Sequence, residues 1–193
     1  MKGKKFLFFL GGGLLLASAW ALQHQWRDKS LSFSPSFEIE RVEKIQLGKA
    51  SPGSNPQSPH LVTLVKAKQP DASDWRIPDL SNARADERKI ERLLKEIRSS
   101  KGKLVGRDPS LFPNFGLRNE EALQLSLFDG NWTPLFTLLI GVKKEGAQTF
   151  VREPGSNRVY RVNGDLLEAM GVQGEPAREN AGQDFWIKGE KEL

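Results

Sequence analysis

The chain has no cysteine and only two histidines among its 193 residues. The absence of cysteine excludes disulfides, thiolate metal sites, cysteine nucleophiles and attachment of a lipid to cysteine. His24 and His60 lie far apart in the sequence, and neither has a second histidine at metal-binding spacing such as H-x-x-x-H. We therefore expect both histidines to be structural or solvated.

The motifs of common enzyme classes are also missing. No G-x-S-x-G nucleophile elbow is present, and Gly11–Gly13 lies inside an apolar run instead of between a strand and a helix. The acidic pairs Asp86-Glu87 and Glu120-Glu121 are neighbours in sequence, which is typical of solvated helix ends and turns. The sequence thus indicates no catalytic residue, cofactor site or metal ligand, and we expect a protein that is not an enzyme.

The net charge of +5 is no sign of a nucleic-acid surface. Lys2, Lys4 and Lys5 account for three of the 29 basic residues, and the remaining 26 nearly balance the 24 acidic ones. We therefore expect no nucleic-acid partner.

What the chain does have is a run of 17 uncharged residues, 6–22, directly after these lysines. The run has the length of a short membrane-spanning helix, with the lysines on the cytoplasmic side. It also fits a signal peptide cleaved after Ala19, because Ala17-Ser18-Ala19 resembles an A-x-A site. We prefer a retained single-pass anchor in the cytoplasmic membrane, with secretion to the periplasm as the alternative. The anchor residues would be Phe6, Leu7, Phe8, Phe9, Leu10, Leu14, Leu15, Leu16 and Trp20.

The rest of the chain divides into three parts by composition. Residues 23–37 lack periodicity and suit a tether, residues 38–171 suit a single extracytoplasmic domain, and residues 172–193 suit a loosely ordered tail. A domain of this size can form a core without disulfides or metal.

Periodicity within the domain predicts an α+β fold with a mainly antiparallel, twisted β-sheet. Apolar residues spaced as on one helix face predict a long helix over 83–99, with Asn82 as its N-cap and its stripe packed on the sheet. A short C-terminal helix is expected at 165–170. Alternating or continuous apolar residues predict strands at 43–47, 60–68, 103–105, 123–128, 134–141, 148–152 and 158–162. We expect the first two strands to form a hairpin with an enlarged connection, and the last two to form another.

Two features are candidates for contact with a partner. Phe112 and Phe115 flank a proline and precede a glycine, which favours a rigid loop that either plugs the core or docks a partner. Arg152, Arg158 and Arg161 cluster around one expected hairpin, where they would bind an acidic partner or an anionic lipid, or else face solvent.

The order of several short motifs resembles a known family. These motifs are Trp75-x-Ile77, Ala85-Asp86 before the helical stripe, Phe115-Gly116-Leu117, Ile140-Gly141, Thr149-Phe150-Val151-Arg152 and Val159-Tyr160-Arg161-Val162. In this order, over residues 42–170, they resemble the family called domain of unknown function 4340. The resemblance implies a membrane-anchored, extracytoplasmic protein. Some family members are associated with ABC transport systems of the gliding-motility type. It carries over no catalytic residue, and this chain is short for the family.

These observations lead to three functional expectations. The first is a noncatalytic, membrane-anchored accessory or interaction subunit of a bacterial envelope complex, with an ABC transporter as one candidate and other envelope proteins as partners. The second is a periplasmic module that binds a lipid, glycan or peptide, and the third is an extracytoplasmic hydrolase. A ligand module should have a deep apolar pocket, whereas an interaction subunit should have an exposed apolar surface or sheet edge.

Overall fold

A computed structural model describes residues 32–49, 60–69, 72–145, 148–172 and 183–189. The chain divides into the units Met1–Ser32 and Phe33–Leu193, and the second is the folded domain. The expected anchor residues, Phe6 to Trp20, lie outside the described residues. Within the described ranges, no helix combines the length and apolar character that crossing a membrane requires.

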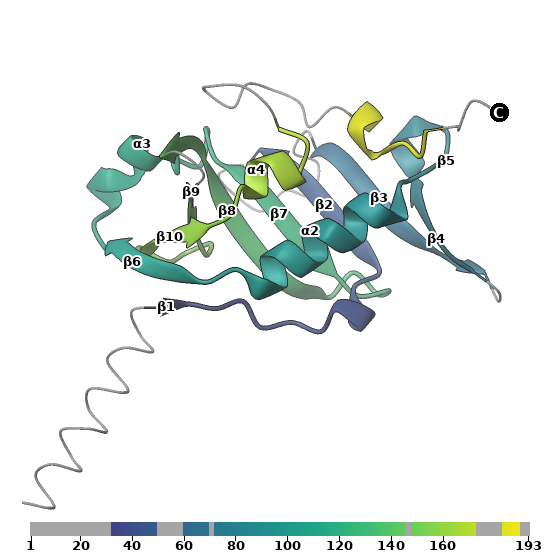
Figure 1. Ribbon diagram of the computed structural model, residues 1–193, viewed down its shortest axis with the longest axis horizontal. Coiled ribbons are helices and arrows are strands. Elements are labelled where there is room, and N and C mark those ends of the chain that lie inside the picture. The colour runs from purple at the N-terminus through teal and green to yellow at the C-terminus, as the bar shows by residue number, and fades with distance from the viewer. Residues whose placement is uncertain (1–31, 50–59, 70–71, 146–147, 173–182, 190–193) are drawn as a thin grey trace, which may run out of the picture. The chain divides into compact units, whose positions relative to one another are not determined.

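The described strands form a ten-stranded sheet in the order β1-β6-β10-β9-β8-β7-β2-β3-β4-β5, and every pair with a defined register is antiparallel (Figure 1). The predicted antiparallel sheet is therefore confirmed. The strands are β1 (Ser32–Phe33), β2 (Lys44–Lys49), β3 (His60–Gln69), β4 (Ala72–Ile77), β5 (Ala83–Arg84), β6 (Gly102–Gly106), β7 (Leu123–Phe128), β8 (Pro134–Glu145), β9 (Gln148–Arg152) and β10 (Val159–Asn163).

Both expected hairpins are present. β2 pairs with β3 across the long connection 50–59, and β9 pairs with β10 across the turn 153–158. A meander from β7 to β10 continues the sheet, and pairing of β2 with β7 joins it to the N-terminal strands. β8 lies in the middle of the sheet, as its continuous apolar sequence predicts.

One long helix, α2 (Glu87–Ser99), crosses the sheet, and it leads from β5 at one edge to β6 near the other (Figure 1). The expected start at Ala83 is wrong, because Ala83 and Arg84 pair with β4 as strand β5. Asn82 is not the N-cap: it adopts a left-handed backbone conformation (φ 61°), which asparagine tolerates well in turns. Asp86 caps the helix instead, and its side chain accepts a hydrogen bond of 3.0 Å from the Arg88 amide.

This reassigned cap gives a first prediction. Replacing Asp86 by alanine leaves a helix-start amide without its acceptor, so the free energy of unfolding should fall by about 1 kcal/mol. Urea unfolding of the full chain in mild detergent measures the change. The exposed Asp79, which lies before the Ser81–Asn82 turn, gives the matched control Asp79→Ala. Equal losses in the two variants would contradict the cap at Asp86.

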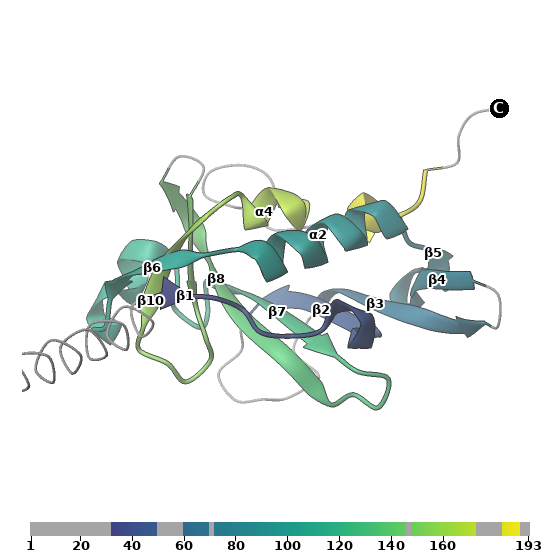
Figure 2. The same ribbon diagram turned by 60° about the horizontal axis from the view of Figure 1, so that its bottom comes forward.

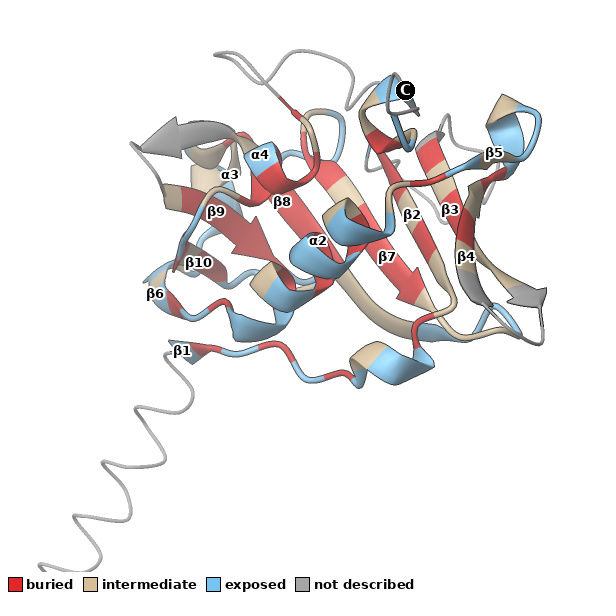
Figure 3. Cartoon of the chain, turned by 45° about the vertical axis from the view of Figure 1, so that its right-hand side comes forward, coloured by how far each residue is buried: buried red, intermediate tan, exposed pale blue. Residues whose placement is uncertain are grey.

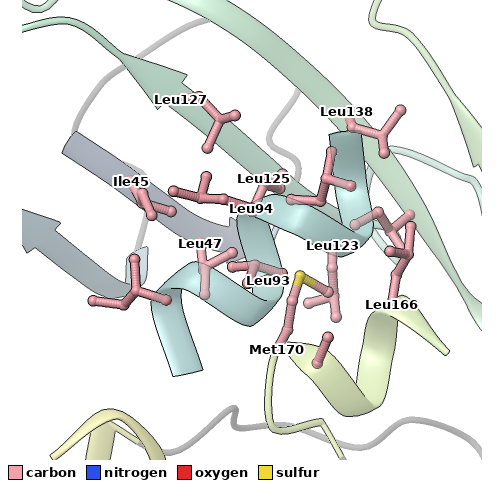
Figure 4. Packing of buried hydrophobic residues seen from close by; sticks show 14 of the residues in the cluster. Ile45, Leu47, Leu93, Leu94, Leu123, Leu125, Leu127, Leu138, Leu166 and Met170 are labelled. Atoms are coloured by element: carbon pink, nitrogen blue, oxygen red, sulfur yellow. The ribbon is translucent and has the colours of Figure 1, made fainter. Parts of the chain in front are cut away.

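The main core lies between α2 and one face of the sheet. The helix buries its apolar stripe, and its polar side faces outward (Figure 3). The predicted short C-terminal helix is present as α4 (Leu166–Ala169), which has Asp165 as its N-cap and lies beside α2 on this face (Figure 2). Figure 4 shows the packing between these helices and the strands, made by Ile45, Leu47, Leu93, Leu94, Leu123, Leu125, Leu127, Leu138, Leu166 and Met170.

A second, smaller core covers the opposite face of the sheet. Successive side chains of a strand point to opposite faces, so the neighbours of Leu138 and Ile140 in β8 face away from α2. Leu139 packs there with Phe150 of β9 and Val159 of β10, under the short helix α3 (Phe112–Phe115). The continuous apolar sequence of β8 follows from this arrangement, because helices cover both of its faces.

The described parts of the expected tether (32–37) and tail (172 and 183–189) contribute side chains to the main core, and the other residues of both segments lie outside the described ranges. Phe33 packs against Tyr160 with ring centroids 5.5 Å apart, and Phe37 stacks on Phe136 at 5.4 Å. Between them, the carbonyl of Pro35 accepts a hydrogen bond from an α2 arginine. At the other end, Trp186 in the 3-10 turn η4 (Gln183–Trp186) is fully buried. Neither segment has the periodicity that reveals a helix or strand.

The turn between β7 and β8 is built around Asp129, which follows the last residue of β7. The Asp129 carboxylate accepts hydrogen bonds from the amides of Thr133 (2.8 Å) and Asn131 (2.9 Å). These bonds, that of Thr133 first, hold the pKa of the Asp129 carboxyl below its ordinary value of 3.8. Trp132 lies in the same turn with φ 64°, and its exposed ring packs against Lys44 and Phe128.

A second prediction concerns the stability of the domain in acid. Because the pKa of Asp129 is lower in the folded than in the unfolded chain, its stabilisation is present above the unfolded-state pKa and is lost as the pH falls through the folded-state pKa. A carboxyl NMR titration should place the Asp129 pKa below 3.8. The hydrogen bonds are local, so the lowered pKa should persist at high salt. Its return to the ordinary value in salt would contradict this origin.

Candidate functional site

The candidate site is a cleft on the face of the sheet opposite α2, which we call the α3 cleft. Its floor is a row of three side chains on adjacent strands: Gln124 of β7 pairs in register with Leu139 of β8, and Leu139 pairs with Arg152 of β9. Because the three residues are cross-strand neighbours, the rigid sheet determines their spacing. The cleft encloses about 710 Å³ and is open to solvent.

One wall of the cleft consists of the 3-10 turn η3 (Pro109–Leu111) and α3. Asp108 caps η3 by accepting a hydrogen bond of 2.9 Å from the Ser110 amide, which lowers the pKa of the Asp108 carboxyl. Pro113 lies in the first turn of α3, where its missing N–H costs nothing. Gly116 ends α3 with φ 64°, a conformation that favours glycine. This local chemistry places Phe112 over the floor.

The opposite wall is the turn between β9 and β10. The Ser156 amide donates to the carbonyl of Glu153 (3.1 Å), and the Ser156 side chain accepts from the amide of Arg158 (3.1 Å). Pro154 and Asn157 line the cleft from this turn, and the segment 118–120 closes a third side.

Arg152 is the main polar group of the cleft, although only 5% of its surface is exposed. Its guanidinium lies 4.5 Å from the ring centre of Phe112, its Nε donates to the carbonyl of Leu117 (3.3 Å), and its Nη2 donates to Oδ1 of Asn119. Burial lowers the pKa of the guanidinium, which nonetheless stays protonated at physiological pH. Among the described residues, no carboxylate lies within 4 Å of this buried charge.

The structure brings together two of the five sequence-predicted docking residues. Phe112 and Arg152 are in contact and line the same cleft. Phe115 lies beneath them, with its ring 4.5 Å from that of Phe150, and supports the wall. Arg158 is exposed beyond the turn, and Arg161 is half-buried on β10; neither lines the cleft. The interpretation of Arg152 as part of a solvent-facing arginine cluster is wrong, because Arg152 points under α3.

Sequence reasoning missed Gln124, Leu139 and Asn119. The sequence contained a signal for the first two. Gln124 alternates with buried leucines of β7, so its side chain must face away from α2. The continuous apolar sequence of β8 requires that both faces of the strand be covered, which places Leu139 in a second core. Asn119 lies in a turn without periodicity, and its role depends on contact with a residue far along the chain.

The ionisable groups of this cleft favour binding over proton transfer or metal coordination. Arg118, Glu120 and Arg152 line it, so it has two positive charges and one negative charge. No cluster of three metal-ligating side chains occurs in the part of the chain that the structure describes. A buried guanidinium beside an aromatic ring and amide side chains is suited to hold an anionic group.

The fold and the cleft together define an α+β domain: a long antiparallel sheet with one helix layer on each face and a polar cleft on the α3 side. The chain belongs to the family described as Domain of unknown function (DUF4340), whose model matches residues 75–177. The match includes α2, α3 and every strand from β5 to β10, so the entire α3 cleft lies within it. Comparisons with curated proteins and with solved structures gave no match.

Proposed function

We propose that this protein is a noncatalytic interaction subunit of a bacterial envelope complex and that it holds its partner in the α3 cleft. The observation that carries the proposal is the Arg152 guanidinium, buried at the floor of an open cleft without a carboxylate partner among the described residues. Burying an uncompensated charge costs stability, and a site that retains such a charge is a candidate for binding an opposite one.

The shape of the cleft supports contact with another protein. A small-molecule site encloses most of its ligand in a mainly apolar pocket. The α3 cleft is open, and polar side chains of Ser110, Asn119, Gln124 and Asn157 share its lining with Phe112. This mixture resembles the polar, partly wet surface of a protein–protein contact.

The chemistry of the cleft supports a noncatalytic role. Among the described lining residues, Glu120 is the one carboxylate, whereas glycoside hydrolysis uses two on opposite sides of the bond. Ser110 and Ser156 line the cleft, and the described lining includes no histidine that could activate them. The side chains that line the cleft are suited to bind and orient a ligand, and none of them specifically supports a hydrolase function.

The location is part of the same proposal. An uncharged run behind three lysines would anchor the chain in the cytoplasmic membrane and place the domain outside the cytoplasm, near other envelope proteins. An ABC transporter is one candidate complex, because some members of the family are associated with such systems.

A second candidate is a periplasmic binding module for a small ligand, favoured by the volume of the cleft. About 710 Å³ lies within the ordinary range of ligand sites. In that case the protein would bind a free solute and be recovered without a protein partner.

Site-specific photo-crosslinking in native membranes tests the proposal. A crosslinking amino acid at Asn157, exposed on the rim of the cleft, should trap one discrete envelope protein. The same amino acid at Arg88, exposed on α2, should not, because α2 covers the other face of the sheet. Repeated recovery of the protein alone, or the same products from both positions, would contradict an interaction role.

Mass spectrometry of the native N-terminus tests the anchor separately. An intact leader in the membrane fraction is expected. A mature chain that starts at Trp20 would contradict the anchor and leave a soluble periplasmic protein.

A further inference from the structure

We infer that the α3 cleft contains a binding site for a peptide carboxylate and that the Arg152 guanidinium receives it. The inference rests on the proposed function in one respect: it names the chemical group of the partner that the cleft holds. It requires no anchor, transporter or particular complex.

The hydrogen bonds of Arg152 leave one edge of its guanidinium available. Leu117 and Asn119 accept from Nε and Nη2, which together form one edge of the planar group. Nη1 and the second N–H of Nη2 form the adjacent edge, and no described residue accepts from it. Two parallel N–H groups on a guanidinium edge match the two oxygens of a carboxylate.

The Arg152 guanidinium is also preorganised for binding a carboxylate. Phe112 lies against the guanidinium at 4.5 Å, and the Leu117 and Asn119 bonds fix its orientation. Little side-chain freedom is therefore lost when a ligand binds, and the low exposure of Arg152 strengthens its attraction for an anion.

The charge balance favours a monoanion. Arg118 and Arg152 give two positive charges to the lining, Glu120 gives one negative charge, and Arg118 lies 4.0 Å from a further carboxylate, that of Glu121. One net positive charge at most is thus available. A carboxylate matches that charge, whereas a phosphate dianion would leave one negative charge uncompensated beside Glu120.

The lining favours a peptide as the carrier of the carboxylate. The Arg152 guanidinium covers one face of the Phe112 ring, so that face is not available for a sugar to stack on. The apolar side chain of the floor is the nearly buried Leu139, which offers little exposed surface to an acyl chain. Ser110, Gln124 and Asn157 instead offer donors and acceptors suited to peptide amides.

NMR titration of the full chain in detergent micelles tests the site on the unmodified protein. The probes are the peptide acetyl-Gly-Gly-Ala with a free C-terminal carboxylate, the same peptide as a C-terminal amide, and inorganic phosphate. The carboxylate peptide should shift the Arg152 Nε–H and Asn119 side-chain resonances with an affinity at least about tenfold higher than the other two probes, because only it gains the paired charged bonds. Equal affinity for acid and amide, or tighter binding of phosphate, would overturn the inference.

Two matched arginine variants test whether the preference for the carboxylate peptide depends on Arg152. Arg152→Lys keeps the positive charge but loses the two-pronged edge, so the preference for acid over amide should become clearly weaker. Arg158→Lys changes a nearby exposed arginine and should keep the preference. A weaker preference in Arg158→Lys, or an undiminished one in a folded Arg152→Lys, would overturn the assignment. If Arg152→Lys does not fold, the three probes on the unmodified protein still decide.

The two proposals fail in different ways. A clear preference for the carboxylate, combined with no crosslinked partner from Asn157, would support the site and contradict the interaction subunit. A partner crosslinked equally well to the Arg152→Lys protein would support the interaction subunit and contradict the carboxylate site.

Discussion

Replacing Trp186 by alanine is expected to lower the free energy of unfolding by about 3–5 kcal/mol, the usual cost of removing a buried tryptophan. Trp186 is among the largest fully buried side chains of the domain, although it lies in the segment 183–189 near the end of the chain. Its removal would leave a cavity beside α2, and the surrounding strands and helix can fill it only in part.

Backbone hydrogen bonds around Trp186 indicate that its replacement should also destabilise the start of α2. The carbonyl of Trp186 accepts a hydrogen bond of 2.7 Å from the amide of Asp86, at the start of α2. Ile187 forms an antiparallel bridge with Ala85, and the amide of Lys188 donates to the carbonyl of Arg84. Displacing the tryptophan would therefore loosen the start of α2 as well.

Trp186→Phe separates packing from hydrogen bonding. The Nε1 of Trp186 is buried, and no described residue accepts its hydrogen bond. An unpartnered buried N–H costs about 1–3 kcal/mol, so phenylalanine, which lacks it, should recover much of the stability lost in alanine. Lys188→Ala, at an exposed neighbouring position, is the control. Urea unfolding of the full chain in detergent measures all three, and a Trp186→Ala loss no larger than the control would show that the segment does not belong to the core.

The contrast between Trp186 and α2 shows what sequence patterns can reveal. The α2 stripe repeats at helical spacing, so Ile90, Leu93, Leu94 and Ile97 point to one buried face without any knowledge of the fold. The strands carry a similar local signal. Phe33, Phe37 and Trp186 are isolated aromatics in segments without periodicity, and their burial depends on contacts with remote strands and helices.

The sequence pointed to individual residues of the candidate site but did not predict that they lie in contact. The segment around Phe112 and the residue Arg152 both stood out in the sequence, on separate grounds. Their contact requires Arg152 to face α3, which follows from the alternation in β9 once Phe150 and Val151 are assigned to faces. The register of β9 against β8 shifts between Ile140 and Lys144, and no local pattern encodes that shift.

Replacing Gly141 by alanine is expected to damage both the fold and the cleft. Gly141 follows Ile140 in β8 and faces α3, and a Cβ atom there would lie 2.1 Å from the carbonyl oxygen of Phe115. Backbone cannot give way as a flexible side chain can, so α3 must move off the sheet. Overpacking of this kind costs about 1–3 kcal/mol and more when backbone is displaced.

The displacement should reach Arg152 through the chain that follows α3. The amide of Val142 donates to the carbonyl of Gly116 at 3.4 Å, and Leu117 accepts the Arg152 Nε bond. When α3 shifts, the guanidinium should lose both this acceptor and its contact with Phe112. We therefore expect Gly141→Ala to abolish the preference for the carboxylate peptide over its amide, even under conditions where the protein stays folded.

Gly106→Ala provides the matched control for Gly141→Ala. Gly106 lies in β6 near the same wall, but the atom nearest to its added Cβ is the flexible Leu111 Cδ1, at 3.1 Å. This variant should lose little stability and keep the carboxylate preference. Urea unfolding and the peptide titration, run on both variants, compare the two glycines directly. A methyl group at Gly141 cannot occupy the space of the Phe115 carbonyl. If Gly141→Ala nevertheless retained wild-type stability and the preference for the carboxylate peptide, the close approach of α3 to β8 could not be what forms the cleft.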